Sequence, residues 1–402
     1  MGIDYKHTFD LVEFENSPLP KINYSEGILP GDALHIKPNG ILFDYGIKDY
    51  PIEVTANELF HKVFFKNSGS IVPFDIFGAA FWLITRYEEY LPHKTDHYNR
   101  FHYSSSLAYQ YGFLGIPLVN LWLTKLQEIL ARTFPALRFE QRAYSFLSSI
   151  DIDNAFKYKF KGFVRTLAGL VSDRSIFKMT QRLRIILNKE KDPFDCYDFL
   201  IDTHKQKEIK AIYFFLLGDY GPNDKNHSAS NLNFQVLIKH LADYSMVGIH
   251  PSFRSNGSLH QLKVETNRLS NITYKTITKS RQHFSILRFP KTYHDLVQAG
   301  IIMDYSMGYP NFNGFRASYC YPYKWYNLEI ESHTPLWIHP FCISETTLIA
   351  DSQKENKSLM ELAKPLIAES RKYNGQLLSI FHNDLFNEEI KRFYLEFLEA
   401  AK

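Results

Sequence analysis

The chain has 402 residues, 45% of them hydrophobic and 22% charged, with a formal net charge of +3. This is the composition of an ordinary globular protein with enough chain for two or three domains, and so small a charge gives no support to nucleic-acid binding. Cys196, Cys320 and Cys342 are far apart and the N-terminal residues carry charges throughout, so we expect buried thiols, no signal peptide and a cytoplasmic location.

Residues 1–142 predict a separate, smaller N-terminal domain of mixed α+β type. Its first part contains short strand-like pieces separated by turn residues such as Asn39-Gly40. A helix is predicted over residues 74–90, where Pro92 ends it, and a second one over residues 118–133. We find no group of catalytic residue types in this part of the sequence.

Residues 143–402 alternate between strand-like and helix-like segments. Such alternation predicts an α/β domain, here a (β/α) barrel-like one. In a barrel the carboxyl ends of the strands meet at one mouth, where catalytic residues lie. The predicted strands cover residues 144–150, 210–217, 245–249, 284–287, 301–305, 336–338 and 377–381, and the predicted helices cover residues 231–244, 259–269, 293–299 and 359–373.

A basic segment interrupts this alternation between residues 157 and 191. It holds ten lysines and arginines against two acidic residues, with apolar side chains interleaved among them. Such a pattern fits peripheral contact with an anionic membrane surface, or the binding of an anionic substrate. The alternative is the solvated face of an ordinary helix.

Two aspartates, Asp151 and Asp153, close the first predicted strand of the α/β part. Because alternate residues of a strand point to the same side, their carboxylates converge. One of them could bind a metal ion while the other acts as a base. The alternative is a polar strand end, in which Asn154 caps a following helix.

Other polar residues stand at the ends of further predicted strands. His250 comes just after one strand, Arg281 and His283 come before another, and His382 closes the last. Taken singly, each histidine is typical of an ordinary hydrogen-bonded side chain, since the chain has 16 of them. Their shared place at strand ends favours a common site.

The order and content of these segments resemble the polysaccharide deacetylase family, also called the NodB-homology family. The resemblance covers roughly residues 145–400, and it implies a deformed (β/α) barrel of NodB-homology type. It also implies that Asp151 is the catalytic base, that Arg281 orients this base, and that His382 is the general acid. Asp153 and His250 would be ligands of a divalent metal, most commonly Zn²⁺.

The whole chain is similar to a subgroup of this family that is common in Bacteroidetes-type polysaccharide gene sets. Members of this subgroup carry an N-terminal domain of unknown function. The resemblance implies a place in cell-surface polysaccharide synthesis. The shared segments are PFDIF at residues 73–77, TRYEEYLP at 85–92, DIDNA at 151–155, GIHPS at 248–252, RQH at 281–283, DYSMGY at 304–309, GFRAS at 314–318 and HN at 382–383.

The chain departs from the broader family at one metal position. The family has a second metal histidine four residues after the first, where this sequence has Arg254. A guanidinium does not ligate cations, so a zinc site with three protein ligands needs another donor. His283, two residues beyond Arg281 and on its side of the chain, is our candidate. In the alternative, His283 contacts substrate and the metal site is weak or lost.

The activity implied by the resemblance is removal of acetyl groups from an acetylated glycan or a lipid-linked sugar by a metal-dependent hydrolase of carbon–nitrogen bonds. Two alternatives stay open: a hydrolase of non-sugar amides, and a catalytically inactive glycan-binding or assembly protein, which Arg254 favours. The residues that could line the mouth and contact sugar hydroxyls, or be structural, are Asp304, Tyr305, Arg316 and Tyr323. Arg316 could instead pair with a carboxylate in the barrel wall.

Overall fold

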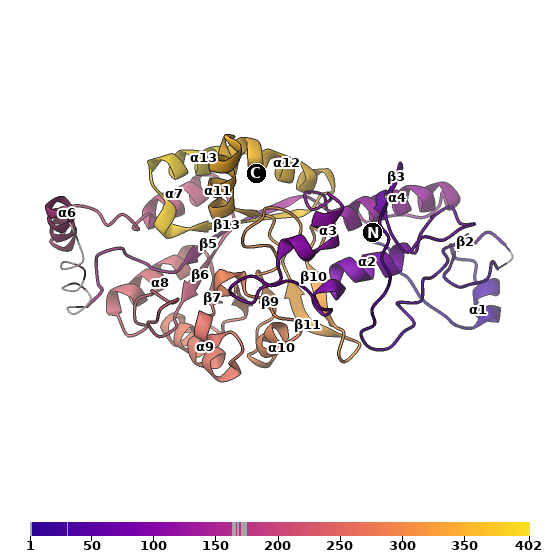
Figure 1. Cartoon of the computed structure of the whole chain (residues 1–402), viewed down its shortest axis with the longest axis horizontal. Helices are drawn as coiled ribbons and strands as arrows, with labels where there is room; N and C mark the ends of the chain where they lie inside the picture. Colours follow the sequence, from indigo (N-terminus) through magenta and orange to yellow (C-terminus); the bar gives the residue numbers. More distant parts are fainter. Residues whose placement is uncertain (1, 30, 163–165, 167–168, 170–174) are drawn as a thin grey trace.

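The computed structural model describes residues 2–29, 31–162, 166, 169 and 175–402 (Figure 1). A nine-stranded sheet lies at the centre of the α/β part, in the order β10-β11-β9-β8-β7-β6-β5-β13-β12. Neighbouring strands are parallel, except for the antiparallel pair β10 and β11. The strands are β5 (Ser145–Ile152), β6 (Ala211–Leu216), β7 (Met246–His250), β8 (Lys279–Ser280), β9 (Met303–Asp304), β10 (Tyr323–Asn327), β11 (Ser332–Ile338), β12 (Ile343–Ser344) and β13 (Gln376–His382).

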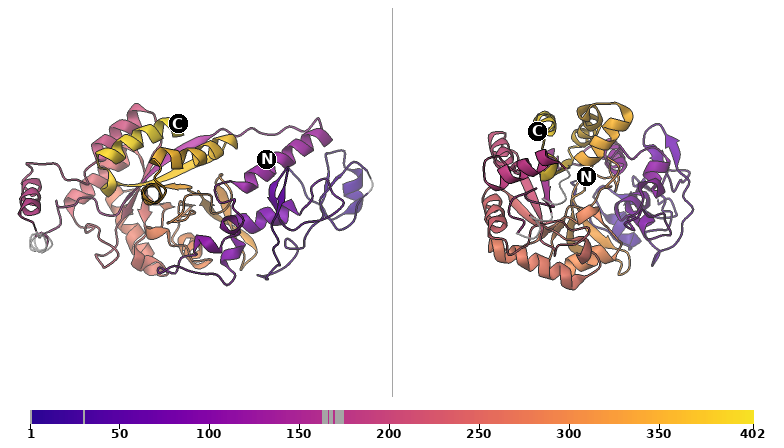
Figure 2. Two further views of the ribbon diagram at one scale, coloured as in Figure 1. Left: turned by 45° about the horizontal axis from the view of Figure 1, so that its top comes forward. Right: turned by 60° about the vertical axis from the view of Figure 1, so that its left-hand side comes forward.

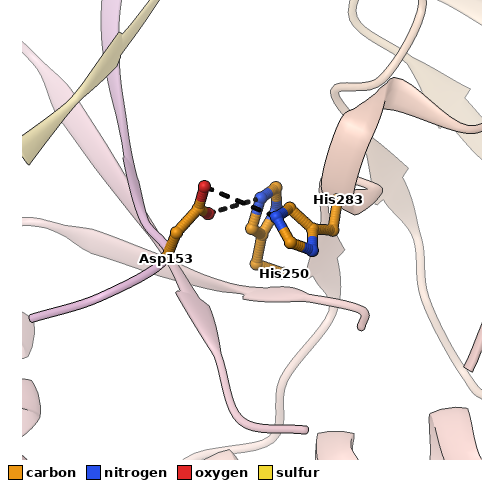
Figure 3. Close-up of side chains that lie close together, drawn as sticks. All are labelled: Asp153, His250 and His283. Atoms are coloured by element: carbon orange, nitrogen blue, oxygen red, sulfur yellow. Dashed lines mark ion pairs between the residues drawn. The ribbon is translucent and has the colours of Figure 1, made fainter. Parts of the chain in front are cut away.

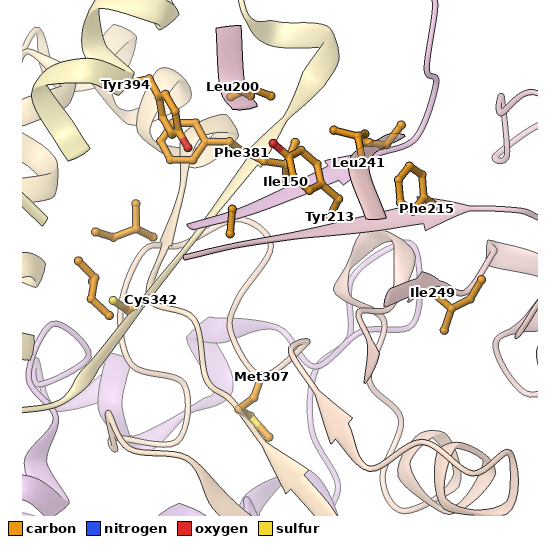
Figure 4. Close-up of a cluster of buried hydrophobic side chains, with 14 of the residues drawn as sticks. Ile150, Leu200, Tyr213, Phe215, Leu241, Ile249, Met307, Cys342, Phe381 and Tyr394 are labelled. Atoms are coloured by element: carbon orange, nitrogen blue, oxygen red, sulfur yellow. The ribbon is translucent and has the colours of Figure 1, made fainter. Parts of the chain in front are cut away.

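Helices connect most of the parallel strands, as crossover connections require. All six residues of β6 are buried, as expected for a strand that is covered on both faces. Ile150 of β5, Tyr213 of β6 and Phe381 of β13 belong to one core together with helix side chains (Figure 4). The helices are α7 (Tyr197–Gln206), α8 (Leu232–Tyr244), α9 (Leu259–Thr273), α10 (Lys291–Gln298), α11 (Glu345–Glu355), α12 (Leu359–Lys372) and α13 (Glu388–Ala401).

The sheet shows a mixed α/β architecture, but a closed barrel is not shown. Strands β10 and β12 stand at the two ends of the order, and no strand pairing joins them among the described residues. Isolated backbone hydrogen bonds link the segment before β12 to the segment after β9: the amide of Phe341 donates to the carbonyl of Met307 (2.9 Å), and the amide of Gly314 donates to the carbonyl of Cys342 (2.9 Å). Such isolated bonds do not make a ladder between strands.

The first part of the chain, drawn in indigo to purple in Figure 2, lies to one side of the sheet and has a hydrophobic core of its own. This core contains the aromatic residues Phe64, Phe74 and Trp122, and two residues of the α/β part, Tyr309 and Leu328, pack into it. The elements here are α1 (Leu11–Asn16), β1 (Ile22–Asn23), β2 (Leu34–His35), β3 (Thr55–Asn57), β4 (His61–Val63), α2 (Ile76–Ile84), α3 (Leu107–Gln110) and α4 (Leu118–Thr133), with the 3₁₀ helices η1 (Tyr87–Glu89) and η2 (Tyr103–Ser105).

Two predicted elements differ from those observed, and in both cases a left-handed residue is the reason. The helix predicted over residues 74–90 is divided into α2 and η1, because Arg86 between them has φ 58°. The strand predicted over residues 284–287 is replaced by the 3₁₀ helix η4 (His283–Ser285), in which Phe284 has φ 57°. A positive φ cannot continue either a helix or a strand.

The basic segment 157–191 contains one described helix, α6 (Ile176–Ile186), which stands apart from the rest of the molecule in two views (Figures 1 and 2). Residues 163–165, 167–168 and 170–174 of this segment lie outside the described residues. In the part of the chain that the structure describes, no helix has both the length and the apolar character needed to cross a membrane.

Candidate metal centre

Three side chains converge at the carboxyl end of the sheet: Asp153, His250 and His283 (Figure 3). One ligand atom of each lies within 4.8 Å of the other two. The Nε2 atom of His250 is 3.1 Å from Asp153 Oδ1, and that of His283 is 3.4 Å from Asp153 Oδ2. The structure therefore brings together all three residues that the sequence proposed as metal ligands.

The order of the strands explains this convergence. His250 is the last residue of β7, and Asp153 follows β5 directly, on the other side of β6. Because the three strands are parallel, their carboxyl ends lie at one edge. After β8 the chain turns into η4, where the left-handed conformation of Phe284 accompanies a change of direction at His283. Residues 154–162 form turns and bends, so Asn154 does not cap a helix directly after the strand.

Each histidine is held through its Nδ1 atom. His250 Nδ1 lies 2.6 Å from the carbonyl oxygen of Arg281, and His283 Nδ1 lies 3.0 Å from Asp224 Oδ1. An Nδ1–H that donates to an oxygen leaves the Nε2 lone pair for a metal ion, the usual arrangement of metal-binding histidines. Both Nε2 atoms then face Asp153.

The sequence did not single out Asp224, which is buried in the loop between β6 and α8. Its Oδ1 also accepts a hydrogen bond from the backbone amide of Phe253 (2.9 Å). Burial alone would raise the pKa of Asp224, but the hydrogen bond with His283 and the hydrogen bonds from the backbone amides of Phe253 and Arg254 lower it. In the sequence, the place of Asp224 after a buried strand is the one sign of a role at the site, and the loop contains no recognisable motif.

The donor set fits a divalent metal ion. Two imidazole nitrogens and one carboxylate are ligands that zinc accepts, and three protein ligands leave a coordination position open. Asp153 Oδ1 is buried and accepts no hydrogen bond. Burial would raise the pKa of Asp153, yet the two histidines hold it well below its usual value. Arg254 is exposed in the 3₁₀ helix η3 (Phe253–Ser255) and is not part of this cluster.

Asp151 lies beside the cluster and is paired with Arg281. Arg281 Nη1 donates to Asp151 Oδ1 (3.2 Å) and to Ser149 Oγ (2.7 Å), while Arg281 Nε donates to the carbonyl of Tyr305 (3.1 Å). The guanidinium is fully buried, and it lies over the ring of Phe214 at 4.8 Å. Burial lowers the pKa of Arg281, although Asp151 opposes this shift.

His382 stands on the other side of Asp151, with its Nε2 atom 4.0 Å from Asp151 Oδ2. Its Nδ1 atom lies 2.6 Å from Glu345 Oε1, which also accepts the backbone amide of His382 (2.7 Å). Burial would lower the pKa of His382, but Glu345 raises it well above its usual value. Glu345 is the fully buried first residue of α11, and nothing in the sequence pattern marks it as a partner of His382.

The residues expected to line the mouth have other partners or positions. Asp304 is buried and accepts hydrogen bonds from Ser280 and Ser306. Tyr305 is buried and its ring stacks on His339 at 4.5 Å. Arg316 is paired with Glu89, so its carboxylate partner belongs to the first part of the chain and not to the strands. The hydroxyl group of Tyr323 is buried and makes no hydrogen bond.

A family model matches the first part of the chain. Residues 1–135, about a third of the chain, match the family model described as "Family of unknown function (DUF7033)". No curated protein sequence matches the chain.

Solved structures of polysaccharide deacetylases are similar to the chain at low sequence identity. A putative polysaccharide deacetylase from Mycobacterium smegmatis has 10% identity and a TM-score of 0.41, over 66% of this chain and 87% of that one. A polysaccharide deacetylase from Bacillus cereus has 12% identity and a TM-score of 0.30, over 65% and 87%. A mutant of a CE4 family pseudoenzyme with restored enzymatic activity has 9% identity and a TM-score of 0.30, over 66% and 64%. These likenesses are remote, so the chemistry of the site has to follow from its own residues.

Proposed function

We propose that the chain is a metal-dependent hydrolase that removes the acetyl group from an N-acetylated sugar or a lipid-linked glycan. The observation that carries this proposal is the cluster of Asp153, His250 and His283 beside two further groups, Asp151 paired with Arg281 and His382 paired with Glu345. A cluster of metal-ligand types, a carboxylate base and a protonated imidazole are the parts that hydrolysis of an unreactive amide requires. The motifs shared with polysaccharide deacetylases point to the same reaction.

We also propose an architecture and a cellular location for the chain. Residues 143–402 form an opened (β/α) barrel of NodB-homology type, preceded by a separate domain over residues 1–142. The strand order from β5 to β9, which is parallel throughout, is consistent with such a barrel. The enzyme acts in the cytoplasm, in the synthesis of cell-surface polysaccharide.

The ion that best suits the donor set is Zn²⁺, held by Asp153, His250 and His283. When bound, such an ion acts as a Lewis acid that makes water nucleophilic at neutral pH and polarises an acyl oxygen. The Nδ1 contacts of the two histidines keep both rings oriented toward the ion. In this proposal His283 supplies the third ligand, in place of the histidine that the family has where this chain has Arg254.

Asp151 and His382 divide the proton transfers between them. Asp151, held in place by the hydrogen bond from Arg281, is the base that accepts the proton of the attacking water. His382 carries a proton because of Glu345, and its Nε2 atom donates that proton to the departing nitrogen. A C–O bond forms and the C–N bond breaks, so the products are acetate and a free amine.

Acetate release from N-acetylated glucosamine oligosaccharides tests the proposal. We expect zinc-dependent release that stops with a chelator and returns when zinc is restored. Asp151→Asn should lower the rate by about 10²–10⁴-fold, the usual effect of losing a general base. Asp243→Asn, at an exposed position of α8, is the matched control and should leave the rate unchanged.

The outcome against the proposal is a zinc-loaded protein that releases no acetate from N-acetylated sugars, or an Asp151→Asn variant with full activity. Release from O-acetylated sugars alone would replace N-deacetylation by ester hydrolysis at the same site.

A further inference from the structure

We infer that α6 and the residues that follow it, 176–191, form a docking surface for an anionic lipid bilayer. Several large apolar side chains of this segment are exposed, including Ile176 (81%), Phe177 (74%) and Leu187 (63%). Ile176, Met179, Leu183 and Leu187 are spaced by three or four residues, so they form one stripe on the helix. This inference is independent of the proposed reaction.

The apolar stripe of α6 faces solvent instead of the protein. The buried residues of the helix are Arg182 and Ile185, and neither belongs to the stripe. The guanidinium of Arg182 lies 4.6 Å from the centre of the Tyr158 ring. The side of α6 that packs against the protein is therefore the side that carries Arg182, away from the apolar stripe. An exposed apolar stripe of this kind is typical of helices that lie in the interface of a membrane.

The positive charge of the segment favours an anionic membrane over a neutral one. Residues 175–191 hold five basic residues and one acidic residue, a net charge of +4. The acidic residue, Glu190, is already paired with Arg184 at 3.1 Å. Lys178 and Lys189 are exposed, so they can approach lipid phosphates while the apolar side chains enter the interface.

A second copy of the chain fits this surface less well than a bilayer. Two α6 stripes in contact would bring two segments of charge +4 together, and the repulsion opposes such a dimer. The position of α6, away from the body of the molecule, leaves room for an extended flat partner (Figures 1 and 2). The segment also leaves the sheet after β5, at the edge where the metal centre lies.

Co-sedimentation of the full chain with lipid vesicles tests the inference. We expect binding to vesicles of phosphatidylcholine with phosphatidylglycerol, weak binding to phosphatidylcholine alone, and a loss of binding as salt concentration rises. Leu183→Asp should weaken binding to the anionic vesicles about tenfold or more, because it places a negative charge in the apolar stripe that enters the membrane interface. Lys178→Glu should weaken it as well. Val236→Asp, at a 66% exposed apolar position of α8, is the matched control and should bind like the unmodified chain.

The inference is overturned if the chain does not bind anionic vesicles at low salt, or if the Leu183→Asp and Val236→Asp variants bind these vesicles equally well. A concentration-dependent dimer in light scattering that Leu183→Asp abolishes would replace the bilayer by a second copy. These measurements need neither zinc nor activity, so a failure of the deacetylase proposal leaves them interpretable.

Discussion

The two histidines of the candidate metal centre owe their orientation to residues outside the cluster. His250 is held by the carbonyl of Arg281, and His283 by Asp224. The family resemblance implied His250 as a ligand, and His283 was chosen because Arg254 stands where the family has its second histidine. The sequence could not predict Asp224, because this residue lies 59 positions away from His283 in a loop. A contact over such a distance follows from the fold and not from local spacing.

Asp224→Asn should weaken zinc binding by about 10–100-fold, the usual effect of losing the carboxylate behind a metal-binding histidine. The amide keeps the size of the side chain but no longer fixes the His283 ring through a charged acceptor. Isothermal titration of the metal-free protein with zinc measures the effect. Asp219→Asn, in the same loop and paired with Arg268, is the control. Equal affinities for both variants would show that Asp224 does not orient His283.

Glu345→Gln should lower the pKa of His382, because the carboxylate that raises this pKa is removed. In the proposed reaction His382 is the general acid and must be protonated, so the rate should fall as the pH rises through its pKa. The alkaline limb of the rate profile should therefore move to lower pH in the variant. If the alkaline limb of the pH–rate profile did not move, it would report the pKa of a group other than His382.

The element that carries His283 is braced by a loop of the first part of the chain. Arg100 Nη1 donates to the carbonyl of Phe284 (2.6 Å), and the ring of Tyr98 stacks on that of Phe284 at 4.9 Å. Phe284 in turn stacks on His283 at 4.0 Å. The strand predicted at 284–287 was wrong, since a sequence pattern does not reveal a left-handed phenylalanine whose conformation depends on distant contacts.

Arg100→Ala should weaken zinc binding about tenfold, because the carbonyl of Phe284 loses its donor and η4 is less well fixed. Zinc affinity and thermal unfolding should be measured together. Arg138→Ala, which removes an exposed arginine that bonds only nearby carbonyls, is the control. A variant with normal stability and normal zinc affinity would mean that the loop does not support the site.

At the scale of the molecule, a buried ionic cluster joins the two hydrophobic cores. Glu89 of η1 accepts hydrogen bonds from Arg86 Nε (2.7 Å) and Arg316 Nε (2.9 Å). All three side chains are almost completely buried. The sequence identified both segments as motifs and left open whether Arg316 pairs with a carboxylate. It could not identify Glu89 as the partner, because 227 residues separate the two.

Glu89→Gln should lower the free energy of unfolding by about 3–5 kcal/mol, since two buried guanidinium groups lose their common counter-charge. Denaturant titration followed by tryptophan fluorescence measures this change. Glu128→Gln, in an exposed pair with Lys125, is the control and should cost less than about 1 kcal/mol. Equal losses of unfolding free energy in both variants would show that the ionic cluster does not stabilise the contact between the two cores.

The most direct test is a calorimetric titration of the metal-free chain with zinc. We expect one ion per chain, with binding abolished in His250→Ala and in His283→Ala. His294→Ala, at an exposed histidine of α10, should bind zinc normally. No stoichiometric binding, or binding that both ligand variants retain, would contradict the assignment of Asp153, His250 and His283 as a metal centre.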